Sequence, residues 1–445
     1  MRIWFAEHRT STANANNQMT HGHESKMRVA QTGPIITSIT RAHYSQLDGL
    51  RGLAILLVVF YHFSLPHRDF HGNEPGVVLQ LAQAGWMGVD LFFVLSGFLI
   101  TGILMETRTQ AHYFRNFLGR RFLRIWPLYY LNLVVLLVLL PLFMPSIPAQ
   151  LQGMQDKQTW FWLYGANWLF AMEGGFGKTS GGYFWSLAVE EQFYLVWPLV
   201  VYWLSDRALL RTSFALLCLS LVSRIVLANL GVSTGSLYTM TFTHLDGLAV
   251  GSCLAICFRS SEMSARLARL LPVAVVVALL GLLAVRAVDR DLFFWSKAMA
   301  TYGYTFIAIL SGALLVCVMQ GGKAGRLSRL FSNRFMTQCG KYSYALYMIH
   351  VPVAGLLFPP TFRVLDKLTP SVAYDAKFLI FVVVAFVVSC GISVASWYVF
   401  EGPIMALKRY FSYAEARDES RLVVASEVPT ASRTGDAHEP TTRGA

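Results

Sequence analysis

Long apolar runs alternate with short polar segments between about residue 50 and residue 400. An α-helix needs about 20 predominantly apolar residues to cross the hydrocarbon core of a bilayer. The pattern therefore predicts an all-α, polytopic integral membrane protein with about ten transmembrane helices. The expected spans are residues 50–66, 85–105, 125–144, 184–204, 212–230, 243–258, 270–288, 300–319, 343–358 and 378–400.

The composition agrees with a membrane protein. Hydrophobic residues make up 55% of the 445 residues and charged residues only 14%, whereas a soluble domain carries about 25% charged residues. All six cysteines lie in or beside apolar runs, so we expect no disulfide framework. Cys253 and Cys257 share a helix face without a further cysteine or histidine cluster beside them. We therefore expect packing there and no metal site.

Polar segments flank the apolar region at both ends. Residues 1–43 are polar and lack an apolar core of signal-peptide length, so we interpret them as a cytoplasmic extension. Residues 44–410 form the expected membrane domain. Residues 411–445 are again polar, and we expect a disordered cytoplasmic tail.

The net charge of +12 raises the question of nucleic-acid binding. With the N-terminus placed in the cytoplasm, 27 of the 37 lysines and arginines fall in inner segments, nine fall in outer segments, and Arg224 lies within a span. This asymmetry follows the positive-inside rule. It explains the basic patches, so we expect both termini in the cytoplasm and no nucleic-acid partner.

The first expected span carries two polar side chains on one face. Arg51 and His62 are separated by three helical turns plus about 20°, or about 16.5 Å along the axis. Arg51 would lie near one membrane surface and His62 about halfway across. Two interpretations stay open. In the first, the two residues form a functional pair, because lipid-buried helices rarely hold unused ionisable groups. In the second, Arg51 is a positive-inside anchor and His62 forms a hydrogen bond with a neighbouring helix.

Other ionisable groups also interrupt the apolar spans or lie at their ends. Such groups are costly inside a membrane unless they are paired or used. Arg121 and Arg124 are three residues apart and therefore share a helix face. The full set of candidates beyond Arg51 and His62 is Asp90, Arg121, Arg124, Glu190, Glu191, His244, Asp246, His350 and Glu401.

Several of these residues fall in a series of seven segments: LDGLRGLAILLVVFYH, GVDLFFVLSGFLIT, RRFLRIWPLYY, YFWSLAVEEQFYLVWPL, HLDGLAVG, YSYALYMIH and YVFEGP. In this order the segments resemble the acyltransferase 3 family of bacterial integral-membrane O-acyltransferases. The resemblance covers about residues 44 to 405. The family signature, an Arg or Lys followed by ten residues and a His, matches Arg51 and His62. The family's Arg-x-x-Arg pattern matches Arg121 and Arg124.

The resemblance implies that an acyl group, usually acetyl, moves from cytoplasmic acyl-CoA to a hydroxyl of a sugar or similar acceptor. His62 would act as the general base, because histidine titrates near neutral pH. Arg51, Arg121 and Arg124 would bind the phosphates of the donor through their guanidinium forks. The distance of about 16.5 Å between Arg51 and His62 is close to the reach of an extended pantetheine arm.

A carboxylate beside His62 would fix its tautomer, as in hydrolase triads. Glu190 and Asp90 are the two candidates, and the sequence does not choose between them. Aromatic rings that stack on sugars and one further histidine would contact the acceptor: Tyr183, Trp185 and His350.

Each of these roles has a structural alternative. Arg121 and Arg124 would also serve as positive-inside anchors, and His350 would also serve as a helix-packing hydrogen-bonding group. Tyr183 and Trp185 are of the types found at membrane interfaces. One segment departs from the family pattern, because His244 stands two residues before Asp246 where an arginine is expected. This departure weakens a phosphate-binding reading of that segment.

The expected function is that of a multi-pass protein of the bacterial inner membrane, an O-acyltransferase. Its donor substrate would be acyl-CoA, first of all acetyl-CoA, and no metal is expected. Its acceptor would be a cell-envelope sugar, a polysaccharide or a lipid-linked precursor, and its other partners would be membrane lipids. Two alternatives stay open: acylation of a secondary metabolite such as a macrolide sugar, and non-catalytic transport of a lipid-linked sugar. No internal repeat typical of a transporter's duplicated halves is visible.

Overall fold

The computed structural model describes residues 44–71, 77–143, 149–177, 179–321 and 325–413. Over these residues the regular secondary structure is entirely helical, which confirms the all-α prediction. The expected N-terminal extension and residues 414–445 of the expected tail lie outside the described residues, and their placement in the cytoplasm stays a prediction. The helices are α1 (Ser45–His71), α2 (Val77–Gln83), α3 (Gly88–Thr107), α4 (Tyr113–Val134), α5 (Leu140–Phe143), α6 (Ala149–Asp156), α7 (Gln158–Trp162), α8 (Ala166–Glu173), α9 (Phe184–Trp203), α10 (Asp206–Asn229), α11 (Thr234–Thr239), α12 (Asp246–Cys257), α13 (Ser261–Asp289), α14 (Tyr304–Gln320), α15 (Arg326–Phe331), α16 (Arg334–Lys341), α17 (Ser343–Leu368), α18 (Tyr374–Ser396) and α19 (Gly402–Ala406).

Eight helical segments among the described residues are long and apolar enough to cross a membrane. Two of the ten expected spans, 184–204 and 243–258, do not meet this measure. The first corresponds to α9, which carries two glutamates and a glutamine. The second corresponds to α12, whose 12 residues span about 18 Å and cannot cross about 30 Å of hydrocarbon alone. The eight segments are Ser45–His67, Leu79–Thr107, Tyr113–Phe143, Asp206–Asn229, Ser261–Asp289, Met299–Gln320, Ser343–Leu368 and Tyr374–Phe411.

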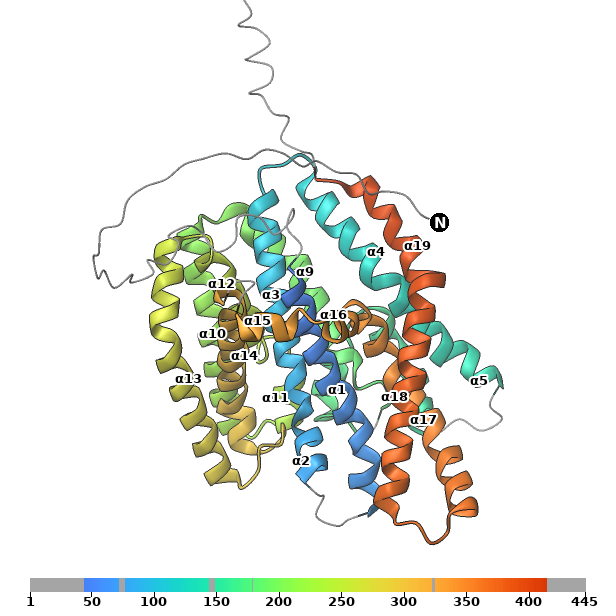
Figure 1. The fold of residues 1–445 in the computed structure, drawn as a ribbon. Coiled ribbons are helices and arrows are strands. Elements are labelled where there is room, and N and C mark those ends of the chain that lie inside the picture. Colours follow the sequence, from blue (N-terminus) through green and yellow to red (C-terminus); the bar gives the residue numbers. More distant parts are fainter. Residues whose placement is uncertain (1–43, 72–76, 144–148, 178, 322–324, 414–445) are drawn as a thin grey trace, which may run out of the picture. The chain divides into compact units, whose positions relative to one another are not determined.

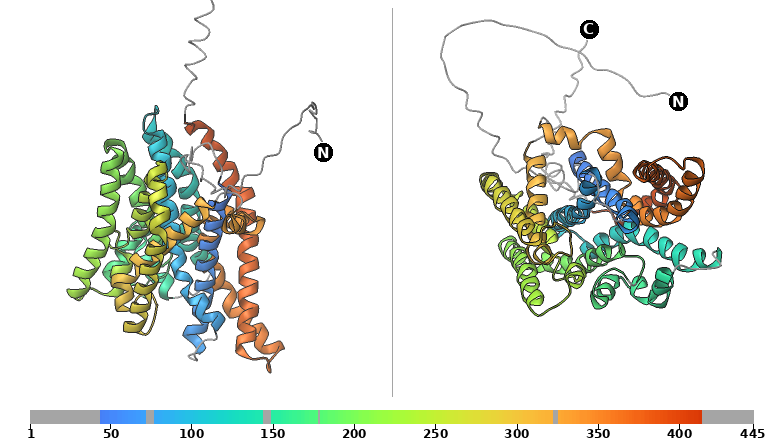
Figure 2. Two further views of the ribbon diagram at one scale, coloured as in Figure 1. Left: turned by 60° about the vertical axis from the view of Figure 1, so that its left-hand side comes forward. Right: turned by 90° about the horizontal axis from the view of Figure 1, so that it is seen from below.

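The helices α1 and α3 lie at the centre of the arrangement, as Figure 1 shows. On one side of them stand α10, α13 and α14, and on the other stand α17 and α18; the view from below in Figure 2 shows the same division. The two central helices bury most of their apolar side chains, while α13 and α18 expose many of theirs. Exposed apolar side chains on the outer helices are what a surrounding bilayer requires. The polar residues of α1 and α3 therefore lie on central helices, inside the ring of helices that face the lipid.

Glycines allow α12 to pack closely against α3, the most extensive contact between two described helices. A Cβ atom on Gly251 would lie 2.1 Å from the carbonyl oxygen of Val94, and one on Gly97 would lie 2.1 Å from that of Leu248. Only glycine leaves room for backbones this close. The short helix α12 is thereby held against α3, near the residues that follow Asp90.

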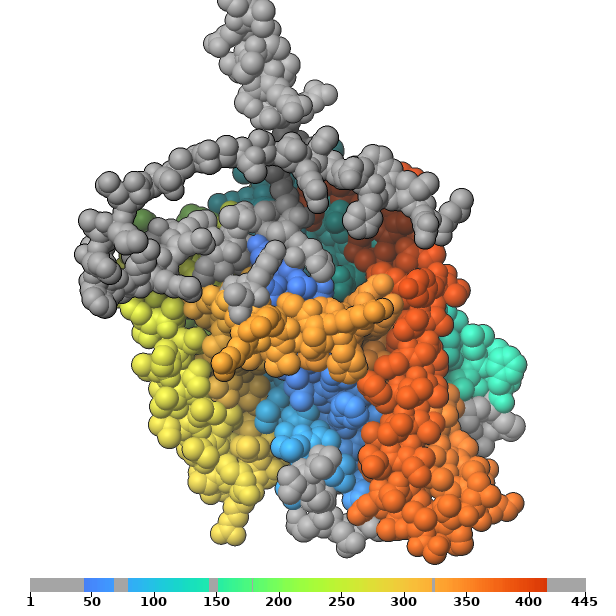
Figure 3. Space-filling view, in the orientation of Figure 1, coloured from blue at the N-terminus to red at the C-terminus, as the bar shows by residue number. Residues whose placement is uncertain are grey.

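A second set of glycines brings α15 and α16 across α1. A Cβ on Gly49 would lie 1.7 Å from the carbonyl oxygen of Phe331, and one on Gly340 would lie 1.8 Å from that of Asp48. The space-filling view in Figure 3 shows this segment crossing over α1. The crossing takes place beside Arg51 and so builds a wall next to that side chain.

A proline in α17 connects three helices through hydrogen bonds. Pro352 has no N–H, so the carbonyl of Met348 loses its helical partner. The Nδ2 of Asn132 on α4 donates to that carbonyl at 3.0 Å. The Oδ1 of Asn132 in turn accepts from the hydroxyl of Tyr183, at the start of α9, at 3.0 Å. These two hydrogen bonds connect α4, α9 and α17 within one turn of His350.

Candidate active site

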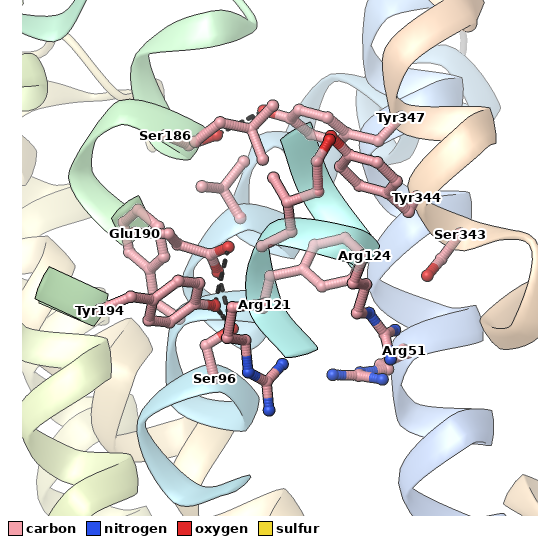
Figure 4. Close-up of a pocket in the computed structure, with 15 residues that line it drawn as sticks. Arg51, Ser96, Arg121, Arg124, Ser186, Glu190, Tyr194, Ser343, Tyr344 and Tyr347 are labelled. Carbon is pink, nitrogen blue, oxygen red and sulfur yellow. Dashed lines mark hydrogen bonds between the residues drawn. The ribbon is translucent and has the colours of Figure 1, made fainter. Parts of the chain in front are cut away.

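Three arginines from two helices meet in one cavity, which we call the middle cavity. Arg51 comes from α1, and Arg121 and Arg124 come from adjacent turns of α4. Figure 4 shows the three guanidinium groups on the same side of this cavity. None of them forms an ion pair within the described residues, and the guanidinium of Arg121 lies over the ring of Tyr194 at 5.8 Å. Three half-buried like charges so close together favour an anionic ligand.

A larger cavity, the inner cavity, adjoins this cluster. Its volume is about 400 Å³, and Arg51 and Arg124 form part of its wall. Lys341, at the end of α16, adds a further cation and lies 5.0 Å from the ring of Trp397, which also lines the cavity. Neither Lys341 nor Trp397 is predicted at this site from the sequence. Tertiary packing alone places them beside the arginines.

Glu190 lies in the middle cavity with the arginines. Its Oε1 accepts from the hydroxyl of Ser96 at 2.7 Å, and its Oε2 accepts from that of Tyr194 at 3.1 Å (Figure 4). The neighbouring Glu191 points elsewhere and accepts from the indole N–H of Trp126 at 3.0 Å. The helical period of α9 thus separates the two carboxylates, and only Glu190 faces the cavity.

His62 lines a third cavity, the outer cavity, of about 360 Å³. Tyr183 and Trp185 are part of the same wall, together with Trp86, Tyr238 and Phe294, and their role towards an acceptor stays a prediction. Burial raises the pKa of Tyr183 and that of Tyr238 well above the ordinary value for tyrosine. No motif signals Tyr238 or Phe294, so the sequence does not predict them at the site.

The three cavities share walls in series. Arg51, Arg124 and Tyr344 line both the inner and the middle cavity, and Val89 and Tyr347 line both the middle and the outer cavity. The middle cavity, at about 80 Å³, has the smallest volume of the three. The three cavities therefore adjoin one another between the arginine cluster and His62.

His350 lies directly beside His62. The Nε2 atom of His350 is 3.2 Å from Nδ1 of His62, and the two rings meet edge to face with centroids 4.8 Å apart. Nδ1 of His62 also lies 2.9 Å from the carbonyl oxygen of Val58. His350 is fully buried, whereas His62 is half-buried and borders the outer cavity.

Neither carboxylate expected to orient His62 contacts it within the described residues. Glu190 bonds to Ser96 and Tyr194, as described above. Asp90 is buried, and its Oδ1 lies 3.2 Å from Nε2 of His244 instead. The expectation failed because periodicity places a residue on a face of its own helix and does not say which neighbouring helix that face meets.

The departure at His244 has a structural counterpart. Asp246 forms a bidentate pair with Arg224 of α10, with N–O distances of 2.6 and 2.8 Å. The hydroxyl of Thr305 donates to the same carboxylate at 2.6 Å. All of these side chains are buried, and none lines one of the three cavities. The charged pair therefore joins α10, α12 and α14 and lies apart from the three cavities.

Comparisons with known proteins show which family contains the residues that line these cavities. The acyltransferase 3 family model, described as an acyltransferase domain, matches residues 44–398. The chain is 31% identical over 340 residues to the peptidoglycan O-acetyltransferase OatA of Listeria monocytogenes, covering 73% of this chain and 51% of the relative. It is 31% identical over 332 residues to the putative peptidoglycan O-acetyltransferase YrhL of Bacillus subtilis, covering 70% and 49%.

A third relative is the O-acetyltransferase OatA of Staphylococcus aureus, 28% identical over 321 residues, with 69% of this chain and 50% of the relative covered. No solved structure matches the chain. The chain thus spans about half the length of the curated relatives it matches. The matched residues hold Arg51, His62, Arg121, Arg124, Glu190 and His350. This chain therefore belongs to the acyltransferase 3 family.

Proposed function

We propose that this protein is a membrane O-acetyltransferase that moves an acetyl group from acetyl-CoA to a hydroxyl of a cell-wall sugar. The observation that carries the proposal is the series of three adjoining cavities between a cluster of arginines and a histidine. Two of the relatives named above are called peptidoglycan O-acetyltransferases, and this supports a glycan of the cell wall as the acceptor. The names of these relatives favour a cell-wall glycan over a secondary metabolite, and the arginine cluster beside the cavities favours acyl transfer over transport.

The donor would enter through the inner cavity. The phosphates of coenzyme A carry several negative charges, which Arg51, Arg121 and Arg124 would bind, with bidentate contacts where the geometry allows. Lys341 would add a point charge at the rim and Trp397 an aromatic face. The pantetheine arm would pass through the small middle cavity. Along α1, the rise of about 16.5 Å from Arg51 to His62 would bring the thioester close to the imidazole.

The acceptor hydroxyl would meet the thioester in the outer cavity. A hydroxyl is a weak nucleophile at neutral pH, and a base that accepts its proton contributes about 10²- to 10⁴-fold to the rate. His62 would take that proton as the oxygen attacks the thioester carbonyl. The C–S bond then breaks, and His62 returns the proton to the departing sulfur, so that coenzyme A leaves as a thiol. The aromatic wall that includes Trp185 offers faces on which a sugar ring stacks.

The test is acetyl transfer in sealed membrane vesicles that contain the purified protein, with labelled acetyl-CoA and peptidoglycan glycan fragments as acceptor. Wild type is expected to release free coenzyme A and to add acetyl units to the glycan, and His62→Ala is expected to lose at least about 10²-fold in rate. His112→Asn is the matched control, because His112 is exposed and has a left-handed backbone that asparagine tolerates. Full activity in His62→Ala would rule out the proposed base. Movement of a lipid-linked sugar without coenzyme A release in wild type would favour the transporter.

A further inference from the structure

The contacts of two neighbouring histidines define where their protons lie. Nδ1 of His350 is 2.9 Å from the carbonyl oxygen of Leu346, four residues earlier in α17. A carbonyl only accepts hydrogen bonds, so Nδ1 of His350 carries the proton. In the neutral ring, Nε2 of His350 then has a free lone pair, and this is the atom that lies 3.2 Å from His62.

The same reasoning applies to His62. Its Nδ1 faces two acceptors, the carbonyl of Val58 at 2.9 Å and the Nε2 lone pair of His350 at 3.2 Å. Nδ1 of His62 must therefore be the donor, and Nε2 of His62 is left unprotonated. In this tautomer the basic nitrogen of His62 is Nε2, on the side of the ring opposite to His350. His62 itself borders the outer cavity.

We propose that His350 is a positioning residue for His62, in the place that a carboxylate occupies in a hydrolase triad. The inference rests on the proposed function, and it assigns His350 to the base and not to the acceptor. His350 would hold the His62 ring in the tautomer that has its lone pair on Nε2. It would also accept a stronger hydrogen bond from Nδ1–H when His62 becomes an imidazolium.

The proton balance follows directly. Nε2 of His62 takes the proton of the acceptor hydroxyl while the new C–O bond forms, and the ring is then an imidazolium with Nδ1–H directed at His350. When the C–S bond breaks, Nε2 gives the proton to the sulfur. Nδ1–H of His62 stays in place throughout, and no oxidant, reductant or second base is needed.

A neutral imidazole suits this position better than a carboxylate would. His350 is fully buried and has the rings of Phe63, Tyr183 and Tyr347 around it, with centroids 6.3, 6.2 and 5.8 Å away. A permanent negative charge in such surroundings is costly. A lone pair on a neutral ring offers an acceptor to Nδ1–H without that cost. Charge then develops only in the short-lived imidazolium of His62.

A direct test is solid-state NMR of the full protein in lipid bilayers with ¹⁵N-labelled histidine at neutral pH. The signals of each ring are assigned by their loss in His62→Asn and in His350→Asn. We expect both rings to be neutral, with Nδ1 protonated and Nε2 unprotonated. A proton on Nε2 of either ring in the resting protein would overturn the inference.

A second test uses two substitutions of different chemistry at the same position. His350→Leu removes the side-chain acceptor of Nδ1–H and leaves only the carbonyl of Val58. We expect kcat to fall roughly 10²-fold with the KM values for acetyl-CoA and for the glycan unchanged. His350→Gln retains an amide oxygen near the position of Nε2, and we expect it to recover about 10-fold of that loss. Equal thermal stability of both variants in detergent excludes a folding effect.

The outcomes separate this inference from the proposed function. A wild type that transfers no acetyl group contradicts the proposed function. The NMR experiment on the same sample tests only the inferred proton positions on His62 and His350. An active wild type with unchanged kcat in His350→Leu contradicts the positioning role alone. A rise in the glycan KM without a change in kcat would return His350 to the acceptor site.

Discussion

At the scale of single residues, the arginine cluster is the feature most open to direct test. Arg51 lines both the inner and the middle cavity and has no ion-pair partner within the described residues. A cation that is left without a carboxylate partner at a cavity wall is available to a ligand. Lysine preserves the charge but not the bidentate geometry of the guanidinium.

Arg51→Ala is therefore expected to raise the KM for acetyl-CoA about 10- to 100-fold, since hydrogen bonds to charged groups contribute roughly 1.5–3 kcal/mol. Arg51→Lys should lose less. The KM for the glycan should not change in either variant. The control is Arg115→Ala, because Arg115 is exposed on α4 and lies over the ring of Phe411, away from the cavities. Steady-state kinetics in vesicles measure Arg51→Ala, Arg51→Lys and Arg115→Ala. A change in Arg51→Ala that affects only the KM for the glycan would contradict a donor site.

The buried pair of Arg224 and Asp246 belongs to the same scale but has a structural role. Removing one partner of a buried ion pair leaves an uncompensated charge and typically costs about 3–5 kcal/mol. We expect Asp246→Asn to lower the midpoint of thermal unfolding in detergent and the yield of folded protein. The kcat of the protein that does fold should change little. A variant with wild-type stability and a lost activity would instead place this pair in the reaction.

At the scale of helices, close packing through glycine decides where polar residues meet. The contact between α3 and α12 depends on Gly97 and Gly251, where an added Cβ would lie 2.1 Å from a backbone oxygen. A side chain there forces the backbones apart, because a carbonyl cannot move out of the way as a flexible side chain can. The position of α3 in turn sets the positions of Ser96 and of the cavity wall.

Gly251→Leu should therefore prevent α12 from seating against α3, and we expect a severe loss of folded protein after extraction. Gly391→Ala is the matched control, since a Cβ at Gly391 in α18 meets nothing within 4 Å. Its stability should equal or slightly exceed that of wild type, because alanine favours a helix over glycine by about 1 kcal/mol. Size-exclusion profiles and thermal unfolding measure both variants. A normally folded Gly251→Leu would show that the close packing is dispensable.

At the scale of the whole described region, the three cavities in series matter most. Five long helices contribute to them, and the small middle cavity lies between the arginines and His62. Ser343, at the start of α17, lines the middle cavity (Figure 4). Its small side chain leaves room that a pantetheine arm would need.

Ser343→Trp should obstruct the middle cavity while leaving the inner cavity free. We expect acetyl transfer to be lost, with unchanged binding of adenosine 3′,5′-bisphosphate, which is the nucleotide end of coenzyme A without its arm. Ser343→Ala is the control and should retain activity. Calorimetric binding and the transfer assay report the two parts separately. Retained transfer in Ser343→Trp would mean that the thioester reaches His62 by another route.

The helices, the family and the relations within each helix can all be predicted from the amino-acid sequence alone. Apolar runs of membrane-spanning length predict α-helices because a lipid-exposed backbone must satisfy its own hydrogen bonds. Helical periodicity likewise places Arg51 with His62, and Arg121 with Arg124, on single faces. These relations are local, so they can be read from spacing alone.

Which helix faces meet is known from the tertiary structure and not from the spacing of residues. The tertiary structure brought His350 to His62 across 288 residues of sequence, placed Asp90 beside His244, and aligned three cavities between helices that are distant along the chain. It also held the short helix α12 against α3 and turned Glu190 of α9 towards the middle cavity. Such contacts depend on side-chain packing and on close backbone approaches at glycine, for which helical spacing holds no information.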